Sequence, residues 1–206
     1  MTELEKRDYK NIDTKIQEIN ETFKEESLNT KPYSVRFKDA MIMGDSMAEG
    51  IIEYGLVSEK NVVAERGKRT DNIDDEIRQV IRYEPKIIFM VYGLNDLEYC
   101  RGNAQRFVNQ YKIQIEKIQK ALPHTRIYIN SITPIDQVAQ SKNKAYTKVS
   151  SFNTALMKLC KEMNIVYIDT TKLIDFSKDV YEKDGIHPLY PYYPVWLTHM
   201  LEVAGL

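Results

Sequence analysis

Between Ala40 and Gly50 the sequence reads AMIMGDSMAEG, an apolar run followed by Gly, Asp and Ser. The near-continuous apolar character of residues 40–43 predicts a buried strand, and a helix is predicted near 48–54. Ser46 lies between the two. Its hydroxyl would therefore lie at the carboxyl edge of a sheet, and its N–H near a helix N-terminus, where developing negative charge is stabilised. That is a suitable place for a nucleophile, although Asp and Ser before a helix also serve simply as caps.

The rest of the chain repeats this strand and helix alternation. Four further apolar runs predict strands near residues 61–64, 86–92, 126–130 and 165–168. Further helices are predicted near residues 72–82, 104–122, 146–163 and 191–203. This pattern is typical of an α/β protein whose parallel sheet is covered by helices on both faces and whose ligands bind beyond the carboxyl ends of the strands. No G-x-G-x-x-G follows the first strand, so dinucleotide binding has little support.

Length and composition fit one ordinary globular domain, with 206 residues of which 43% are apolar and 29% are charged. The 29 Lys and Arg against 30 Asp and Glu leave a net charge of −1, which argues against nucleic acid as a partner. No membrane span is expected, because the longest apolar run, residues 87–92, is far short of the roughly 18 residues required. Cys100, Cys160 and the three His have no metal-ligand spacing, so neither a metal nor another cofactor is expected.

The first 31 residues differ from the remainder. Apolar residues recur from Tyr9 to Phe23 at alternating three- and four-residue steps, which predicts an amphipathic helix over about residues 3–26. We expect it to pack on the domain formed by residues 32–206; the alternative, a coiled-coil stalk, would need a longer repeat. The sequence as given begins with no signal peptide. A trimmed secreted or anchored protein would look the same, so localisation is left open, as is the oligomeric state.

Two other polar clusters complete a candidate site. Gly93-Leu94-Asn95-Asp96 follows the third predicted strand, and Asp184-Gly185-Ile186-His187 lies near the C-terminus. Serine hydrolysis requires an imidazole to take the hydroxyl proton, a carboxylate to orient that imidazole, and donors for the oxyanion. Asp184 is close enough to accept from Nδ1 of His187 while Nε2 faces Ser46. Each residue alone could be a cap, a turn former or a satisfied histidine, but their conjunction at the strand ends favours catalysis.

These residues resemble the sequence blocks of the SGNH hydrolases, also called the GDSL esterase/lipase family. The resemblance extends from about residue 40 to the C-terminus. It implies a flavodoxin-like three-layer α/β/α sandwich with a five-stranded parallel sheet, in agreement with the alternation above. It also implies that Ser46 is the nucleophile and that Asp184 and His187 complete the catalytic triad.

The same resemblance assigns the oxyanion hole. It implies that the backbone N–H of Ser46, the backbone N–H of Gly67 and the side chain of Asn95 donate to the oxyanion. The block around Gly67 is the least similar, because Thr70 stands where many members have a second glycine. Because a backbone donor requires only an accessible N–H, this departure concerns the path of the loop more than the role of Gly67.

The expected function is that of a serine esterase that hydrolyses short-chain acyl esters, with O-acetyl groups on carbohydrate or cell-wall glycan as the substrate class. A Leu- or Phe-rich lid for long acyl chains is missing from the sequence, although a lysophospholipase or thioesterase is the alternative within hydrolases. A non-catalytic binding module on the same fold is the alternative from another class, and the intact Ser46, Asp184 and His187 argue against it. Tyrosines after His187 could line the cleft or pack in the core. The polar stretch 134–144 could border the site.

Overall fold

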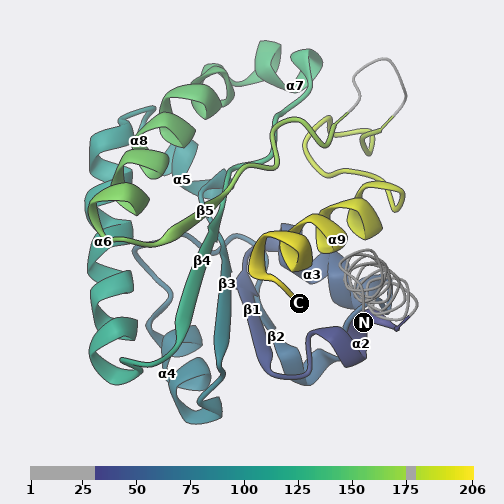
Figure 1. Ribbon diagram of the computed structural model, residues 1–206. Coiled ribbons are helices and arrows are strands. Elements are labelled where there is room, and N and C mark those ends of the chain that lie inside the picture. Colours follow the sequence, from purple (N-terminus) through teal and green to yellow (C-terminus); the bar gives the residue numbers. More distant parts are fainter. Residues whose placement is uncertain (1–30, 175–179) are drawn as a thin grey trace, which may run out of the picture.

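The computed structural model describes residues 31–174 and 180–206, which form a three-layer α/β/α sandwich (Figure 1). The central sheet has five strands in the order β2-β1-β3-β4-β5, and each adjacent pair is parallel. The strands are β1 (Ala40–Gly44), β2 (Val62–Ala64), β3 (Ile87–Val91), β4 (Arg126–Asn130) and β5 (Val166–Ile168). The predicted α/β class and five-stranded parallel sheet are therefore confirmed, with strand ends within one residue of the predicted ones.

Helices connect the strands and cover both faces of the sheet. The principal ones are α3 (Ser46–Glu53), α4 (Asp74–Tyr83), α6 (Ala104–Ala121), α8 (Val149–Glu162) and α9 (Tyr192–Ala204). Figure 1 shows α4, α6 and α8 on one side of the sheet and α3 and α9 on the other. Each connection between parallel strands is a crossover that places a helix on one face of the sheet. With helices on both faces, both faces of the sheet are buried in apolar layers.

Alternation along the central strands divides the core in two. Met41 and Met43 of β1 pack with the α4, α6 and α8 side, whereas Ala40 and Ile42 pack with the α3 and α9 side. This is the two-residue period of a strand whose faces are both buried. Every residue of β1 and β3 is buried, which explains why both strands appeared in the sequence as unbroken apolar runs.

Three short helices were not predicted from the sequence. They are α2 (Tyr33–Arg36), α5 (Leu94–Tyr99) and α7 (Gln137–Lys142), with 3₁₀ turns at Glu59–Asn61 and Lys144–Lys148. The polar stretch 134–144 thus contains α7. Helices of four to six residues span less than two turns, so they show no periodic pattern that a sequence can reveal. The predicted helix over residues 3–26 lies outside the described residues.

Candidate active site

Ser46 lies at the junction of β1 and α3, as the sequence predicted. It is the first residue of α3, and Asp45 caps that helix by accepting from the backbone N–H of Met47 at 3.0 Å. Gly44 permits the sharp turn, because a Cβ there would lie 2.7 Å from both Ala48 Cβ and the Val91 carbonyl oxygen. The serine is therefore held at the carboxyl end of β1, at the N-terminus of a helix.

The structure brings His187 and Asp184 to Ser46. His187 Nε2 lies 2.8 Å from Ser46 Oγ, and His187 Nδ1 lies 2.6 Å from Asp184 Oδ2. The second oxygen, Asp184 Oδ1, accepts from the backbone N–H groups of Ile186 and His187 at 2.8 and 3.0 Å. Both carboxylate oxygens are therefore fixed, and the imidazole bridges acid and serine in the order that proton transfer requires.

Hydrogen bonds determine the charge of Asp184. Burial raises its pKa, but hydrogen bonds from the His187 ring and from the backbone N–H groups of Ile186 and His187 outweigh burial, so the net pKa lies below its usual value. The carboxylate is thus ionised at neutral pH and can stabilise a positive charge on the imidazole.

The three predicted oxyanion donors follow the carboxyl ends of β1, β2 and β3, which are neighbours in the sheet. In the described part of the chain the backbone N–H groups of Ser46 and Gly67 donate to no other group. Gly67 is exposed with φ +82°, and this left-handed conformation favours glycine. Asn95 Nδ2 lies 3.2 Å from Asp45 Oδ2 and 3.0 Å from the Lys68 carbonyl oxygen. The amide is therefore oriented by the residue before the serine and by the residue after Gly67.

Thr70, which stands where many members of the resembled family have a second glycine, anchors the Gly67 loop. Its backbone N–H donates to both oxygens of Asp96, at 3.1 and 3.2 Å, and its hydroxyl donates to Asp96 Oδ1 at 2.6 Å. Gln114 of α6 donates to the Thr70 carbonyl at 2.8 Å. A threonine is therefore compatible with the loop, because its side chain is used to fix it.

Two further contacts hold the other side of this loop. The backbone N–H of Arg66 donates to Glu49 Oε1 of α3 at 2.9 Å. The ammonium of Lys68 lies 2.7 Å from the buried carboxylate of Glu76 in α4. The loop is thus fixed on both sides of Gly67.

Asp45 and Asp96 are buried carboxyl groups beneath the donors. Burial raises the pKa of Asp45 to about 7, and the neighbouring Asp96 adds to the increase. Burial also raises the pKa of Asp96 to about 6, against the hydrogen bonds from Thr70. Both groups therefore change charge close to neutral pH.

An open cavity of about 410 Å³ lies at the predicted catalytic residues. Ser46, His187 and Asp184 line it, together with charged side chains at its rim, Glu53, Arg66, Glu182 and Lys183. Sequence reasoning missed this rim and the ring of Tyr54, because these residues come from the end of α3, the Gly67 loop and the stretch before Asp184, which meet only in the folded chain. A pair of rings, Tyr54 and the half-exposed Tyr190, meet edge to face at 5.2 Å beside it.

A much smaller hollow is lined by the chain neighbours of Ser46 but not by Ser46 itself. Its accessible volume is about 10 Å³, and Asp45 and Met47, which flank Ser46 in the chain, line it with Leu94 and Ile186. A space of this size is about that of one water molecule. The two hollows near Ser46 therefore differ greatly in size.

Tyr192 and Trp196, two of the rings after His187, are buried in the core and Tyr193 lies between core and cavity. Packing in the core thus explains most of the aromatic rings after His187.

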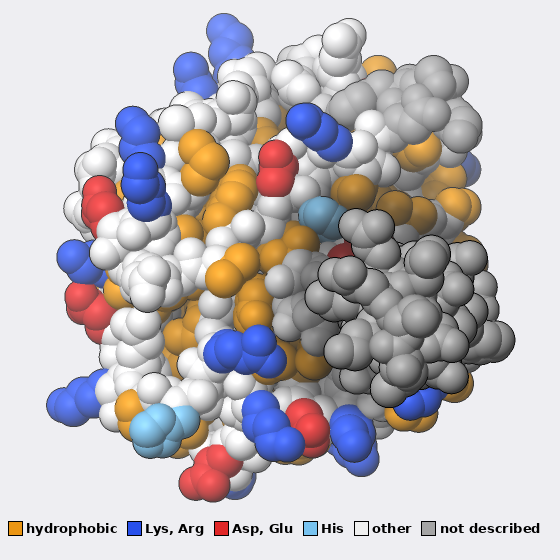
Figure 2. Space-filling model, viewed as in Figure 1, with side chains coloured by type: hydrophobic (Ala, Val, Ile, Leu, Met, Phe, Trp, Pro, Cys, Tyr) orange, Lys and Arg blue, Asp and Glu red, His pale blue; other side chains and the backbone are white. Residues whose placement is uncertain are grey.

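Within residues 31–174 and 180–206, no three His, Cys, Asp or Glu side chains come together as metal ligands. No helix in these ranges is long and apolar enough to cross a membrane. Lys and Arg side chains are scattered over the face in Figure 2 and form no concentrated patch there.

Comparisons with known proteins bear on the family and the fold of the chain. A model of the GDSL-like lipase/acylhydrolase family matches residues 42–190. A GDSL-like lipase from Bacteroides thetaiotaomicron has the same fold, with a TM-score of 0.64 and 17% identity over 90% of this chain and 97% of that one. The sequence comparison with curated proteins gave no match.

Two esterases are also structurally similar. A carbohydrate esterase family 3 protein from Talaromyces cellulolyticus has a TM-score of 0.62 and 17% identity, covering 81% of this chain and 98% of that one. An acetyl esterase variant crystallised with an acetate ion has a TM-score of 0.62 and 16% identity, with coverages of 81% and 98%. At these identities the likeness establishes the fold.

Proposed function

The chain belongs to the GDSL-like lipase/acylhydrolase family of ester hydrolases, and we propose that it is a serine esterase that removes short acyl groups, O-acetyl above all, from carbohydrate. The observation that carries the proposal is the continuous relay from Asp184 Oδ2 through His187 to Ser46 Oγ, with contacts of 2.6 and 2.8 Å. Such a relay activates a hydroxyl that is otherwise a weak nucleophile.

The proposed reaction proceeds in two halves. Ser46 Oγ attacks the ester carbonyl while His187 Nε2 takes its proton, and the resulting oxyanion accepts from the N–H groups of Ser46 and Gly67 and from Asn95. The two hydrogens of Asn95 Nδ2 face Asp45 Oδ2 and the Lys68 carbonyl in the free protein, so the amide shares or releases one of these bonds when it donates to the oxyanion. His187 then returns the proton to the departing alcohol, which leaves an acyl-serine. Water, deprotonated by His187, attacks this ester, and collapse of the second intermediate releases the acid and restores Ser46. Asp184 stabilises the imidazolium in both halves.

The cavities around Ser46 favour a short acyl group on a polar alcohol. Asp45 and Met47, the residues on either side of Ser46 in the chain, line a space of only about 10 Å³, which has room for little more than a methyl group. The larger cavity could accept the alcohol side of the ester, and its rim carries Glu53, Arg66, Glu182 and Lys183. Charged side chains suit a polar alcohol such as a sugar and oppose a long acyl chain. A lysophospholipase or thioesterase is therefore the less favoured function.

A chain-length profile tests the proposal. We expect hydrolysis of p-nitrophenyl acetate, weaker hydrolysis of the butyrate and no measurable hydrolysis of the palmitate. Ser46→Ala, which removes a single hydroxyl, should abolish turnover while the protein remains folded. A serine-directed organophosphonate should add one adduct per chain, at Ser46. An adduct elsewhere would refute the assignment of the nucleophile, and a preference for palmitate would favour the lipid or thioester alternative.

A further inference from the structure

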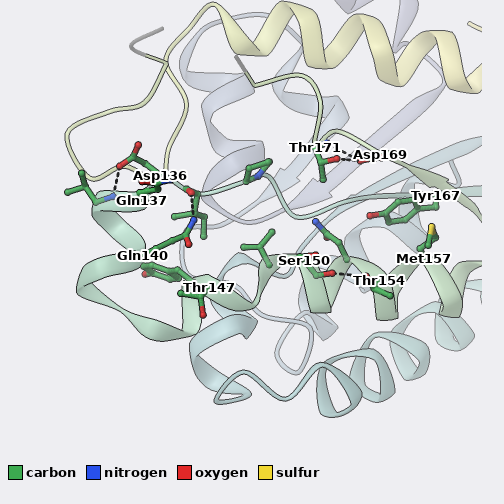
Figure 3. Close-up of a pocket in the computed structure, with 16 residues that line it drawn as sticks. Asp136, Gln137, Gln140, Thr147, Ser150, Thr154, Met157, Tyr167, Asp169 and Thr171 are labelled. Carbon is green, nitrogen blue, oxygen red and sulfur yellow. Dashed lines mark hydrogen bonds between the residues drawn. The ribbon is translucent and has the colours of Figure 1, made fainter. Parts of the chain in front are cut away.

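A second cavity, larger than the one that contains Ser46, lies between α8, α7 and the end of β5. Its volume is about 1020 Å³, against about 410 Å³ for the cavity at Ser46. Figure 3 shows Ser150 and Thr154 of α8 on one side, Asp169 and Thr171 on the other, and Gln137 at one end. We call this cavity the α8 groove. It is at the upper end of the size range of ligand sites.

The chemistry of its lining favours a neutral ligand with many hydroxyl groups. None of the described residues that line the α8 groove is Lys or Arg. Ser150 and Gln137 are exposed, and within the described part of the chain the Ser150 hydroxyl and the Gln137 amide have no hydrogen-bond partner. These groups are free to donate to and accept from a ligand.

Two carboxylates add acceptors to the same cavity. Asp136 Oδ1 accepts from the N–H of Val138 at 2.6 Å, and Asp169 Oδ1 accepts from the N–H of Thr171 at 3.0 Å. In each case Oδ2 has no partner among the described residues, so it can accept from a ligand hydroxyl. The half-buried ring of Tyr167 and the exposed Met157 supply apolar surface beside them. Hydroxyls, amides, carboxylates and aromatic rings are the groups that match the polar edges and apolar faces of sugars.

One turn separates the α8 groove from the active site. Glu182 and Asp184 line the cavity at Ser46, and the N–H of Gly185 donates to the Glu182 carbonyl at 2.9 Å to close the turn. On its other side the Gly185 carbonyl accepts at 2.9 Å from the N–H of Asp136, which lines the groove. The same turn therefore contacts both cavities, so the α8 groove and the active site are neighbours.

We propose that the α8 groove binds a neutral oligosaccharide, the continuation of the sugar chain whose ester is cut at Ser46. The proposal rests on the proposed function, because it extends the substrate beyond the esterified sugar. Anionic chains are disfavoured, since Asp136 and Asp169 face the ligand without a compensating cation. A long acyl chain is also disfavoured, because it would leave the hydroxyl and amide groups of the lining unpaired.

Binding of unesterified sugars to the Ser46→Ala protein tests the groove apart from catalysis. The probes are cellohexaose, xylohexaose and chitohexaose, titrated by calorimetry, and we expect saturable binding of at least one of them. Ser150→Arg places a bulky side chain in the groove and should raise the Kd of that sugar at least about tenfold. Ser151→Arg is the matched control: Ser151 is the next residue of α8, is also exposed, and lines a separate depression towards α6. Its Kd should stay within about twofold of the Ser46→Ala protein.

The outcomes separate this inference from the proposed function. If the parent cleaves p-nitrophenyl acetate but no hexaose binds, or if both arginine variants weaken binding equally, the groove is not a sugar site. Binding of a trilysine peptide in place of the sugars would also overturn the inference, since it would make the groove a site for basic peptides. If the parent cleaves no ester of any chain length, the proposed function itself fails, and the groove loses its role as a substrate site.

Discussion

Replacing Thr70 with Val should destabilise the protein by an amount that depends on pH. The substitution keeps the shape of the side chain and removes the hydroxyl that donates to Asp96 Oδ1 at 2.6 Å. Both residues are fully buried, with 0% of each exposed, so water cannot replace the lost donor. The backbone N–H of residue 70 still faces the carboxyl group, so one of its three hydrogen bonds from Thr70 is lost.

The magnitude follows from the charge of Asp96. Burial raises the pKa of Asp96 to about 6, so the group is ionised at pH 8 and mostly protonated at pH 5. A hydrogen bond to a charged group contributes about 1.5–3 kcal/mol, and one between neutral groups about 0.5–1.5 kcal/mol. We therefore expect Thr70→Val to lower the free energy of unfolding by about 1.5–3 kcal/mol at pH 8 and by about 1 kcal/mol at pH 5.

The sign of the pH dependence is fixed by linkage. The folded pKa of Asp96 lies above its ordinary value of 3.8, so the folded state holds the proton more tightly and loses stability as pH rises through about 6. The Thr70 hydrogen bonds lower that pKa, and removing one raises it again. The variant should therefore lose more stability than the parent as pH increases.

Urea unfolding at pH 5 and pH 8 measures both quantities, with the fluorescence of the single, buried Trp196 as the signal. Thr70→Ser keeps the hydroxyl and is the matched control, expected to lose less than Thr70→Val at pH 8. Equal losses for Thr70→Val at both pH values, or an equal loss for Thr70→Ser, would refute the argument that a bond to an ionised Asp96 is what Thr70 supplies.

Two substitutions at the proposed site should affect kcat. Asn95→Ala should lower kcat about 10²- to 10³-fold with a smaller change in KM, because the amide would stabilise charge present only in the transition state. An unchanged kcat for p-nitrophenyl acetate would exclude Asn95 from the oxyanion hole. Asp184→Asn should lower kcat at least about tenfold, because its amide oxygen can still accept from the backbone while its NH₂ faces His187 Nδ1 and favours the wrong tautomer. The Tm of the Asp184→Asn variant should be little changed. A kcat equal to that of the parent would mean that another group orients His187.

The sequence was sufficient where the signal is local. The buried strands β1 and β3 appear as unbroken apolar runs because both faces of the sheet are covered. Ser46, Asn95 and the Asp184–His187 pair were found because each polar residue stands beside a predicted strand end or within one turn of its partner. The structure places Ser46, Asp184 and His187 in one relay, whereas the roles of these residues remain predictions.

The features that the sequence could not reveal are tertiary. Thr70 and Asp96 are 26 positions apart, and nothing in either motif indicates that one bonds the other. The pKa of Asp45 depends on its burial, which becomes apparent only when β1, β3 and α5 are assembled. The contact between Asp136 and Gly185 also joins distant segments. Asp136 does carry a local signal that was overlooked, because an Asp before a short helix is a typical N-cap, here bonded to the N–H of Val138.

These tertiary contacts explain how a loop with one glycine can replace a loop with two. The backbone donor proposed at Gly67 needs a fixed position and a free N–H, and a glycine elsewhere in the loop supplies neither. Here three neighbours of Gly67 contact acidic side chains on three different helices. Arg66 contacts Glu49 of α3, Lys68 contacts Glu76 of α4, and Thr70 contacts Asp96 of α5. The Arg66 side chain is exposed and adds little, but Lys68 and Thr70 bond buried carboxyl groups that would otherwise be costly. The position of Gly67 is therefore set chiefly by Lys68 and Thr70, and a glycine at position 70 would remove the side chain that ties this loop to Asp96, next to Asn95.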